Sequence, residues 1–190
     1  LSVARVAREG LGKHPWSLGG GGASELKELL EERCEKRLGD VVDSIGPMAV
    51  TVEDEPYVGP AAHFQRQGLP SRPFIFGEAV RDWSLSLDTE VLFPYTDEWT
   101  AANSAAVSKW LWPFRHNLRR RLMFGKTHED AGLDWRVYRF LSQEKARVPR
   151  SIAFAFVATH NHFVLDRGGK VFNRTAPVIK LPASATEDDH

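Results

Sequence analysis

The residues best suited to chemistry form the tripeptide His160-Asn161-His162. Side chains two positions apart on a β-strand point to the same face, so His160 and His162 could bind one metal ion together. A metal site needs a third ligand, and no further His or Cys lies at a recognisable spacing. A metal-dependent nuclease that uses His160 and His162 is one hypothesis, and the missing third ligand counts against it. The favoured hypothesis gives all three residues a structural or DNA-contacting role.

Other catalytic motifs are missing from the sequence. The glycine run at 19–22 lacks the Lys-Ser/Thr pair of a phosphate-binding loop and follows no predicted strand. No Gly-x-Ser-x-Gly nucleophile elbow occurs. Cys34 is the single cysteine, and we expect it on the buried face of a helix, where a thiol is unreactive. A lone cysteine forms no internal disulfide, which favours a reducing cytoplasm. We predict no catalytic residue and no metal ligand in this chain.

The strongest binding signal is the segment Lys109–Arg121, in which aromatic and basic residues alternate. Helical spacing would bury one apolar face and gather the basic side chains on another. The side chains gathered in this way are Arg115, Arg119 and Arg120. An arginine fork donates two parallel hydrogen bonds to a phosphate or to the O6/N7 edge of guanine. The alternative is an amphipathic helix with a solvated basic face.

Charge is distributed unevenly along the chain, although the net charge is zero. The segment Lys109–Arg150 holds eleven Lys or Arg residues against four Asp or Glu residues. Such a split indicates one surface that faces a polyanion. The predicted DNA-contacting cations are Arg81, Arg115, Arg119, Arg120, Arg121, Lys126, Arg136 and Arg139. The aromatic residues Trp83, Trp110, Trp112 and Phe163 are expected to lie in the core and not to stack on bases.

Two helices are predicted to position these residues. The first begins after Ser24 as N-cap and runs to Leu38, with Gly39 just beyond its end. The second runs from Ala101 to Leu122 and should break at Pro113, because proline removes a helical hydrogen bond.

Short apolar runs between turn residues predict strands at 48–52, 74–76, 152–158, 162–165, 170–172 and 177–182. Gly168 and Gly169 should form the turn of a hairpin, and 177–182 should be an edge strand. These elements predict an α+β fold with a mixed or antiparallel sheet and a few flanking helices.

The predicted organisation is a flexible N-terminal segment at 1–23, one domain at 24–182 and a disordered acidic tail at 183–190. A start at Leu1 without an initiator Met suggests part of a longer protein. No apolar run approaches the ~20 residues that cross a bilayer, so we expect no membrane contact.

Several motifs in this order resemble the specificity region of adenine-specific DNA methyltransferases. The motifs are Gly77-Glu78-Ala79-Val80-Arg81-Asp82-Trp83, Leu92-Phe93-Pro94-Tyr95, Trp110-Leu111-Trp112-Pro113-x-Arg115-x-x-Leu118-x-x-Arg121, Ala158–Asn173 and Ala176–Pro182. The pattern is similar to large methyltransferases with a TaqI-like specificity domain, which serve restriction or BREX- or DISARM-type phage defence.

The resemblance implies a target-recognition domain whose parent enzyme methylates the exocyclic amine of adenine with S-adenosylmethionine. The Asn/Asp-Pro-Pro-Tyr/Phe loop that marks the catalytic domain does not occur in this sequence. The chain is therefore expected to read duplex DNA and to bind no cofactor itself. The implied partners are double-stranded DNA, the methyltransferase domain of the same polypeptide and other defence-system subunits. A protein-interaction module within such a complex is the alternative.

Overall fold

The computed structural model describes Arg8, Gly12 and residues 22–190. The predicted flexible segment at 1–23 and its glycine run lie almost entirely outside these residues. The chain divides into two compact units, Leu1–Val41 and Val42–His190.

The described part of the first unit consists of two helices, α1 (Ala23–Arg33) and α2 (Leu38–Val41). The predicted single helix to Leu38 is therefore wrong, because Cys34 adopts an extended conformation and ends α1. Gly22, not Ser24, is the N-cap residue. Burial of Cys34 was also predicted wrongly: α1 has no buried residue, and Cys34 is exposed.

Two four-stranded sheets form the scaffold of the second unit. The first is antiparallel, in the order β1-β14-β11-β12. Its strands are β1 (Ser44–Gly46), β11 (Ser151–Phe154), β12 (Phe163–Asp166) and β14 (Val178–Lys180). The second has the order β13-β4-β7-β3 and contains one parallel pair, β13 with β4. Its strands are β3 (Val58–Gly59), β4 (Ser71–Ile75), β7 (Glu90–Leu92) and β13 (Val171–Phe172).

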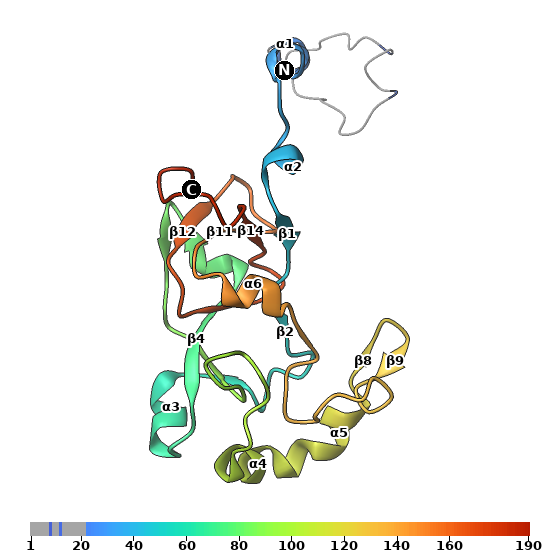
Figure 1. Cartoon of the computed structure of the whole chain (residues 1–190), viewed down its shortest axis with the longest axis vertical. Coiled ribbons are helices and arrows are strands. Elements are labelled where there is room, and N and C mark those ends of the chain that lie inside the picture. The colour runs from blue at the N-terminus through green and yellow to red at the C-terminus, as the bar shows by residue number, and fades with distance from the viewer. Residues whose placement is uncertain (1–7, 9–11, 13–21) are drawn as a thin grey trace, which may run out of the picture. The chain divides into compact units, whose positions relative to one another are not determined.

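Three two-stranded pairs and several short helices complete the unit (Figure 1). The pairs are β2 (Ala49–Val50) with β10 (Phe140–Leu141), β5 (Val80–Arg81) with β6 (Ser84–Leu85), and β8 (Leu122–Met123) with β9 (Lys126–Thr127). The helices are α3 (Ala61–Arg66), η2 (Gly77–Ala79), α4 (Ala105–Leu111), η3 (Trp112–Phe114), α5 (Arg115–Arg120) and α6 (Gln143–Arg147). Helices and mixed sheets confirm the predicted α+β fold.

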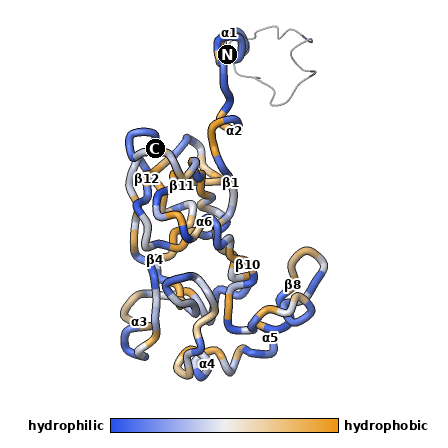
Figure 2. Tube along the Cα trace, in the orientation of Figure 1, coloured by the Kyte–Doolittle hydropathy of each residue, from blue (hydrophilic) through white to orange (hydrophobic). Residues whose placement is uncertain are grey.

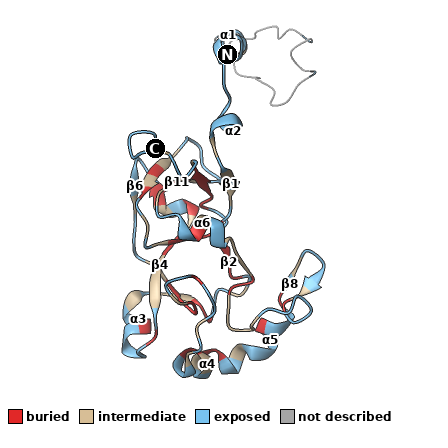
Figure 3. Ribbon diagram, in the orientation of Figure 1, coloured by how far each residue is buried: buried red, intermediate tan, exposed pale blue. Residues whose placement is uncertain are grey.

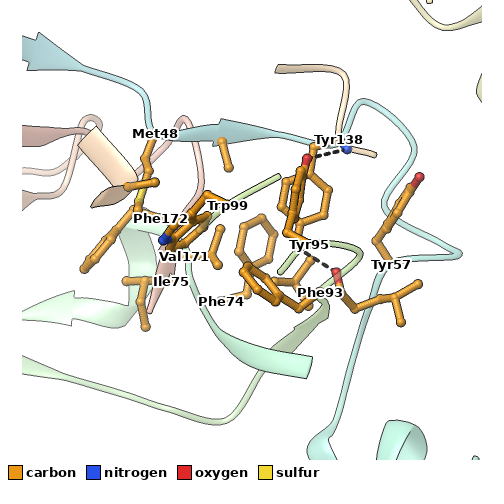
Figure 4. Close-up of a cluster of buried hydrophobic side chains, with 14 of the residues drawn as sticks. Met48, Tyr57, Phe74, Ile75, Phe93, Tyr95, Trp99, Tyr138, Val171 and Phe172 are labelled. Carbon is orange, nitrogen blue, oxygen red and sulfur yellow. Dashed lines mark hydrogen bonds between the residues drawn. The ribbon is translucent and has the colours of Figure 1, made fainter. Parts of the chain in front are cut away.

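An aromatic cluster holds the second unit together (Figure 4). Tyr95 and Tyr138 pack edge to face with ring centroids 5.0 Å apart. Both hydroxyl groups are satisfied inside: Tyr138 donates to the carbonyl of Leu92 at 2.7 Å, and Tyr95 accepts from the amide of Tyr138 at 2.8 Å. The Leu92–Tyr95 motif therefore belongs to the core.

The predicted hairpin after β12 is right in its turn and wrong in its pairing. Gly168 and Gly169 have φ of 105° and 80°, as expected for turn glycines. However, β12 pairs with β11, and β13 pairs with β4 instead of β12. The predicted edge strand is also wrong, because β14 lies between β1 and β11.

Gly77 of the Gly77–Trp83 motif lies directly against the loop after β13. A Cβ atom at this position would lie 2.2 Å from the carbonyl oxygen of Thr175, so only glycine fits. The amide of Gly77 donates to the hydroxyl of Thr175 at 3.0 Å. This contact joins the start of the β5–β6 hairpin to the sheet.

Candidate nucleic-acid interface

Helices α4, η3 and α5 present the basic residues of the Lys109–Arg121 segment. Ser104 caps α4, since its hydroxyl accepts from the amide of Val107 at 3.3 Å. Leu111 and Leu118 are fully buried, which fixes the inner face. The predicted break at Pro113 is confirmed as the 3-10 turn η3. Figure 2 shows hydrophobic and hydrophilic residues alternating along these helices.

Arg115, Arg119 and Arg120 are exposed, as the helical spacing predicts. Arg115 stacks on Trp112, with its guanidinium carbon 4.2 Å from the ring centroid. This contact orients the guanidinium, which also donates from Nη1 to the carbonyl of Trp112 at 3.4 Å. Trp112 itself is 54% exposed, which corrects its predicted place in the core.

Arg121 is buried, lies over the ring of Tyr57 at 5.5 Å, and directs its hydrogen bonds to backbone carbonyls. Its guanidinium donates to the carbonyl oxygens of Leu118 (3.0 Å), Thr51 (2.9 Å), Val137 (2.8 Å) and Trp135 (3.2 Å). Burial lowers the pKa of Arg121, and the nearby Tyr57 opposes this shift. With its donors used in this way, Arg121 is a structural residue, which argues against the predicted DNA contact.

Arg139 is the second buried arginine, and it secures the β8–β9 hairpin. Its guanidinium donates to the carbonyl oxygens of Arg121 (3.2 Å), Met123 (3.0 Å) and Lys126 (2.9 Å). One side chain thus bonds to both strands of the hairpin. This geometry also argues against the predicted DNA contact of Arg139 and gives it a positioning role.

Lys126 lies at the start of β9, and its side chain is exposed. Arg136 is half-buried and pairs with Asp134, its Nε lying 2.9 Å from Oδ1. This bond holds the pKa of the Asp134 carboxyl below its usual value and raises the pKa of Arg136. Arg136 also donates to the hydroxyl of Ser108, so it joins the loop around Asp134 to helix α4. The exposed side chain of Lys126 is available to a ligand, whereas the guanidinium of Arg136 already donates hydrogen bonds to Asp134 and Ser108.

The other predicted site residues gather elsewhere, around the β5–β6 hairpin and β12. Arg81 donates to the carbonyls of Gly77 and Val80 at 2.7 and 2.6 Å. His162 is half-buried, with Nδ1 lying 3.4 Å from the Asp82 carboxylate, whereas His160 and Asn161 are exposed. Among the described residues, no group of three His, Cys, Asp or Glu side chains is placed to hold a metal ion. Figure 1 places β12 and the β8–β9 hairpin at opposite ends of the unit.

Two aromatic residues in hairpin turns are largely exposed. Trp83 is 80% exposed and Phe124 is 89% exposed. Both lie in two-residue hairpin turns with positive φ, 66° for Trp83 and 53° for Phe124. The prediction that Trp83 belongs to the core is wrong. In the sequence, Gly125 was the available signal for the second turn, since glycine favours such positions.

Comparison with known proteins gives a relative that matches the whole length of this chain. The chain is 34% identical to the adenine-specific methyltransferase PglX of Streptomyces coelicolor. The match extends over 198 aligned residues and covers all of this chain, but only 16% of PglX. No protein-family model matches the chain. This similarity is what a segment of a large adenine-specific methyltransferase would show, and it supports a role for the chain in such an enzyme.

One further fact concerns the helices. In the part of the chain that the structure describes, none is long and apolar enough to cross a membrane.

Proposed function

We propose that this chain supplies a duplex DNA-contacting surface to an adenine-specific methyltransferase. The observation that carries the proposal is the exposed set Arg115, Arg119, Arg120 and Lys126 on α5 and the adjoining hairpin. No Asp or Glu occurs between Glu98 and Glu129, so no acidic residue of this stretch offsets these charges. Surface arginines of this kind suit phosphates and guanine edges.

The similarity to PglX supports the choice of DNA as the polyanion. In this proposal the methyl group comes from S-adenosylmethionine bound to a separate methyltransferase domain of the same polypeptide, and the acceptor is the exocyclic amine of adenine. The 190-residue chain contributes recognition and no chemistry. Calorimetric titration with S-adenosylmethionine should accordingly show no saturable binding, and binding at micromolar concentration would contradict this division of labour.

Salt dependence of DNA binding tests the surface directly. Each neutralised phosphate contributes about 0.9 to the slope of log affinity against log salt concentration. A variant with Arg115, Arg119 and Arg120 changed to Ala should therefore bind mixed-sequence duplex DNA more weakly, with a slope flattened by about two to three units. Fluorescence anisotropy at several salt concentrations measures both quantities.

The matched control removes the same charge elsewhere. Arg33, Arg66 and Arg174 are exposed and lie outside the Lys109–Arg121 segment. Changing these three to Ala should leave the salt slope within about one unit of the wild-type value. Equal effects of the two triple variants would show that net charge, and not the α5 surface, determines binding.

A second candidate, contact with partner proteins of a defence complex, is favoured by the exposed leucines of α1. Leu26, Leu29 and Leu30 are 56%, 42% and 60% exposed. An apolar interface of this kind would show little salt dependence, which separates it from DNA binding.

A further inference from the structure

The tip of the β8–β9 hairpin carries a large apolar side chain in an unusual place. Phe124 is 89% exposed, and Leu122, two positions earlier, is 63% exposed. Phe124 also holds φ at 53°, a left-handed conformation that is rare for a bulky residue. Neither burial nor backbone preference favours phenylalanine at this position.

The hairpin is held on both sides of its turn. Arg139 bonds to the carbonyls of Met123 and Lys126, one on each side of the turn. Only Phe124 and Gly125 separate these two anchored residues. The backbone on both sides of the turn is therefore held in place, and Figure 3 shows that residues of the β8 and α5 region are largely exposed. A pre-positioned group loses little conformational entropy when it binds.

Basic residues flank the ring along the chain, and one acidic residue, Glu129, lies beside Arg119, since its amide donates to the Arg119 carbonyl at 3.0 Å. Lys126 follows the turn, and Arg119 and Arg120 end the helix that leads into β8, all exposed. The nearest acidic residues along the chain are Glu129 and Asp130, and the carboxylate of Asp130 accepts a 2.6 Å hydrogen bond from the hydroxyl of Thr127. An apolar ring next to cationic side chains suits a ligand such as DNA, which has flat apolar base faces and negatively charged phosphates close together.

Trp83 provides a comparison within the same chain. It occupies the same kind of two-residue turn, with positive φ and 80% exposure. Its neighbour in that turn is Asp82, whose carboxylate faces His162. This acidic side chain makes the Trp83 turn a poor match for phosphates. The two turns therefore share geometry and differ in charge.

We propose that Phe124 acts as a wedge that inserts between neighbouring base pairs of duplex DNA, while Arg119, Arg120 and Lys126 contact the flanking phosphates. The proposal rests on the DNA-binding function proposed above. Apolar side chains such as Phe unstack base steps and bend the duplex in other DNA-binding proteins. Two residues of strand carry the turn roughly 7 Å beyond Arg121, which is comparable with a groove depth of about 7.5–8.5 Å.

A plasmid relaxation assay detects the wedge without knowledge of the recognised sequence. Closed circular DNA is relaxed by a topoisomerase in the presence of the 190-residue chain, and the linking-number distribution is compared after removal of protein. Insertion of a wedge distorts twist, so the wild-type chain should shift the distribution. Protein concentrations are chosen for equal occupancy by fluorescence anisotropy.

Three variants separate the possible outcomes. Phe124→Ala should lose most of the shift and keep the wild-type salt slope, because no charge is removed. Phe124→Leu, which keeps an apolar wedge, and Trp83→Ala, the matched control, should both retain the shift. A full shift with Phe124→Ala, or equal losses with Phe124→Ala and Trp83→Ala, would overturn the wedge and leave DNA binding standing. If the wild-type chain shows no salt-dependent DNA binding, the proposed function itself fails.

Discussion

Arg139 donates a 3.2 Å hydrogen bond to the carbonyl oxygen of Arg121, so two buried arginines are linked in series. Arg121 is anchored to the carbonyl of Thr51, which lies 70 positions earlier in the chain. Arg139 continues the path to both strands of the β8–β9 hairpin. Arg121 and Arg139 therefore connect the basic surface and the Phe124 turn to the core. Arginine suits this role because its planar guanidinium has five N–H donors.

Removing the second arginine should loosen this connection. Arg139→Leu leaves three carbonyl oxygens without their donor, and we expect a loss of ~2–4 kcal/mol in the free energy of unfolding. Arg139→Lys should recover only part of the loss, because an ammonium group cannot reproduce the planar fork. Urea denaturation measures the change.

The control for this experiment is Lys126→Ala. Its carbonyl accepts from Arg139, but its side chain is exposed, so its stability should stay within ~0.5 kcal/mol of the wild type. If Arg139→Leu and Lys126→Ala unfold at the same urea concentration as the wild type, the two-arginine connection contributes nothing to stability.

The helical part of the site was predictable from the sequence. The spacing of Leu111 and Leu118 fixed the inner face, and the chemistry of Pro113 fixed the break. The exposure of Arg119 and Arg120 follows from the same spacing. These features depend on residues only a few positions apart, where local rules apply.

The roles of Arg121 and Arg139 could not be predicted in the same way. A basic residue next to other basic residues indicates a charged surface, and only the fold brings distant carbonyls to these guanidinium groups. Hydropathy likewise indicated burial of Trp83, whereas the hairpin turn exposes it. The pairing of β13 with β4 joins Val171 to Phe74, a separation that no local pattern reveals.

Acid should destabilise the second unit through His128. This side chain is fully buried, and Nε2 donates to the carbonyl of Asp134 at 2.7 Å. Burial lowers the pKa of His128 from 6.5 to about 4, and the charges of Arg121 and Arg139 act in the same direction. The folded state therefore keeps His128 neutral at pH values where the unfolded chain is protonated.

The sign of the effect follows from this difference. Above pH 6.5 the group is neutral in both states and has no influence. As the pH falls from 6.5 towards 4, only the unfolded state binds the proton, and stability should fall by at most ~1.4 kcal/mol per pH unit. His128→Gln should flatten this part of the profile. Melting temperatures measured between these pH values test it, and identical slopes for both proteins would exclude His128 as the cause.

The turn after β12 should resist side chains at both of its glycines. Gly169 has φ of 80° and open space around it, so Gly169→Val should cost ~1 kcal/mol or more through backbone strain alone. Gly168→Val should cost more, because its Cβ would lie 3.3 Å from Pro149. Gly39→Ala in α2 is the control and should not destabilise the chain, since it adds no strain. Unchanged melting of Gly169→Val would show that the turn does not hold this conformation.

Phe124 should make the folded chain less stable than a glycine at the same position would. A non-glycine residue in the left-handed region costs of order 1–3 kcal/mol, and glycine loses roughly 0.5–1 kcal/mol more backbone entropy on folding. Because the ring is 89% exposed, it recovers little by burial. Phe124→Gly should therefore raise the free energy of unfolding, by up to ~2.5 kcal/mol, while it abolishes the linking-number shift. Denaturation and plasmid relaxation on the same preparation measure both effects. A less stable Phe124→Gly chain would mean that the ring contributes to the fold, and the case for phenylalanine as a binding residue would lose its main support.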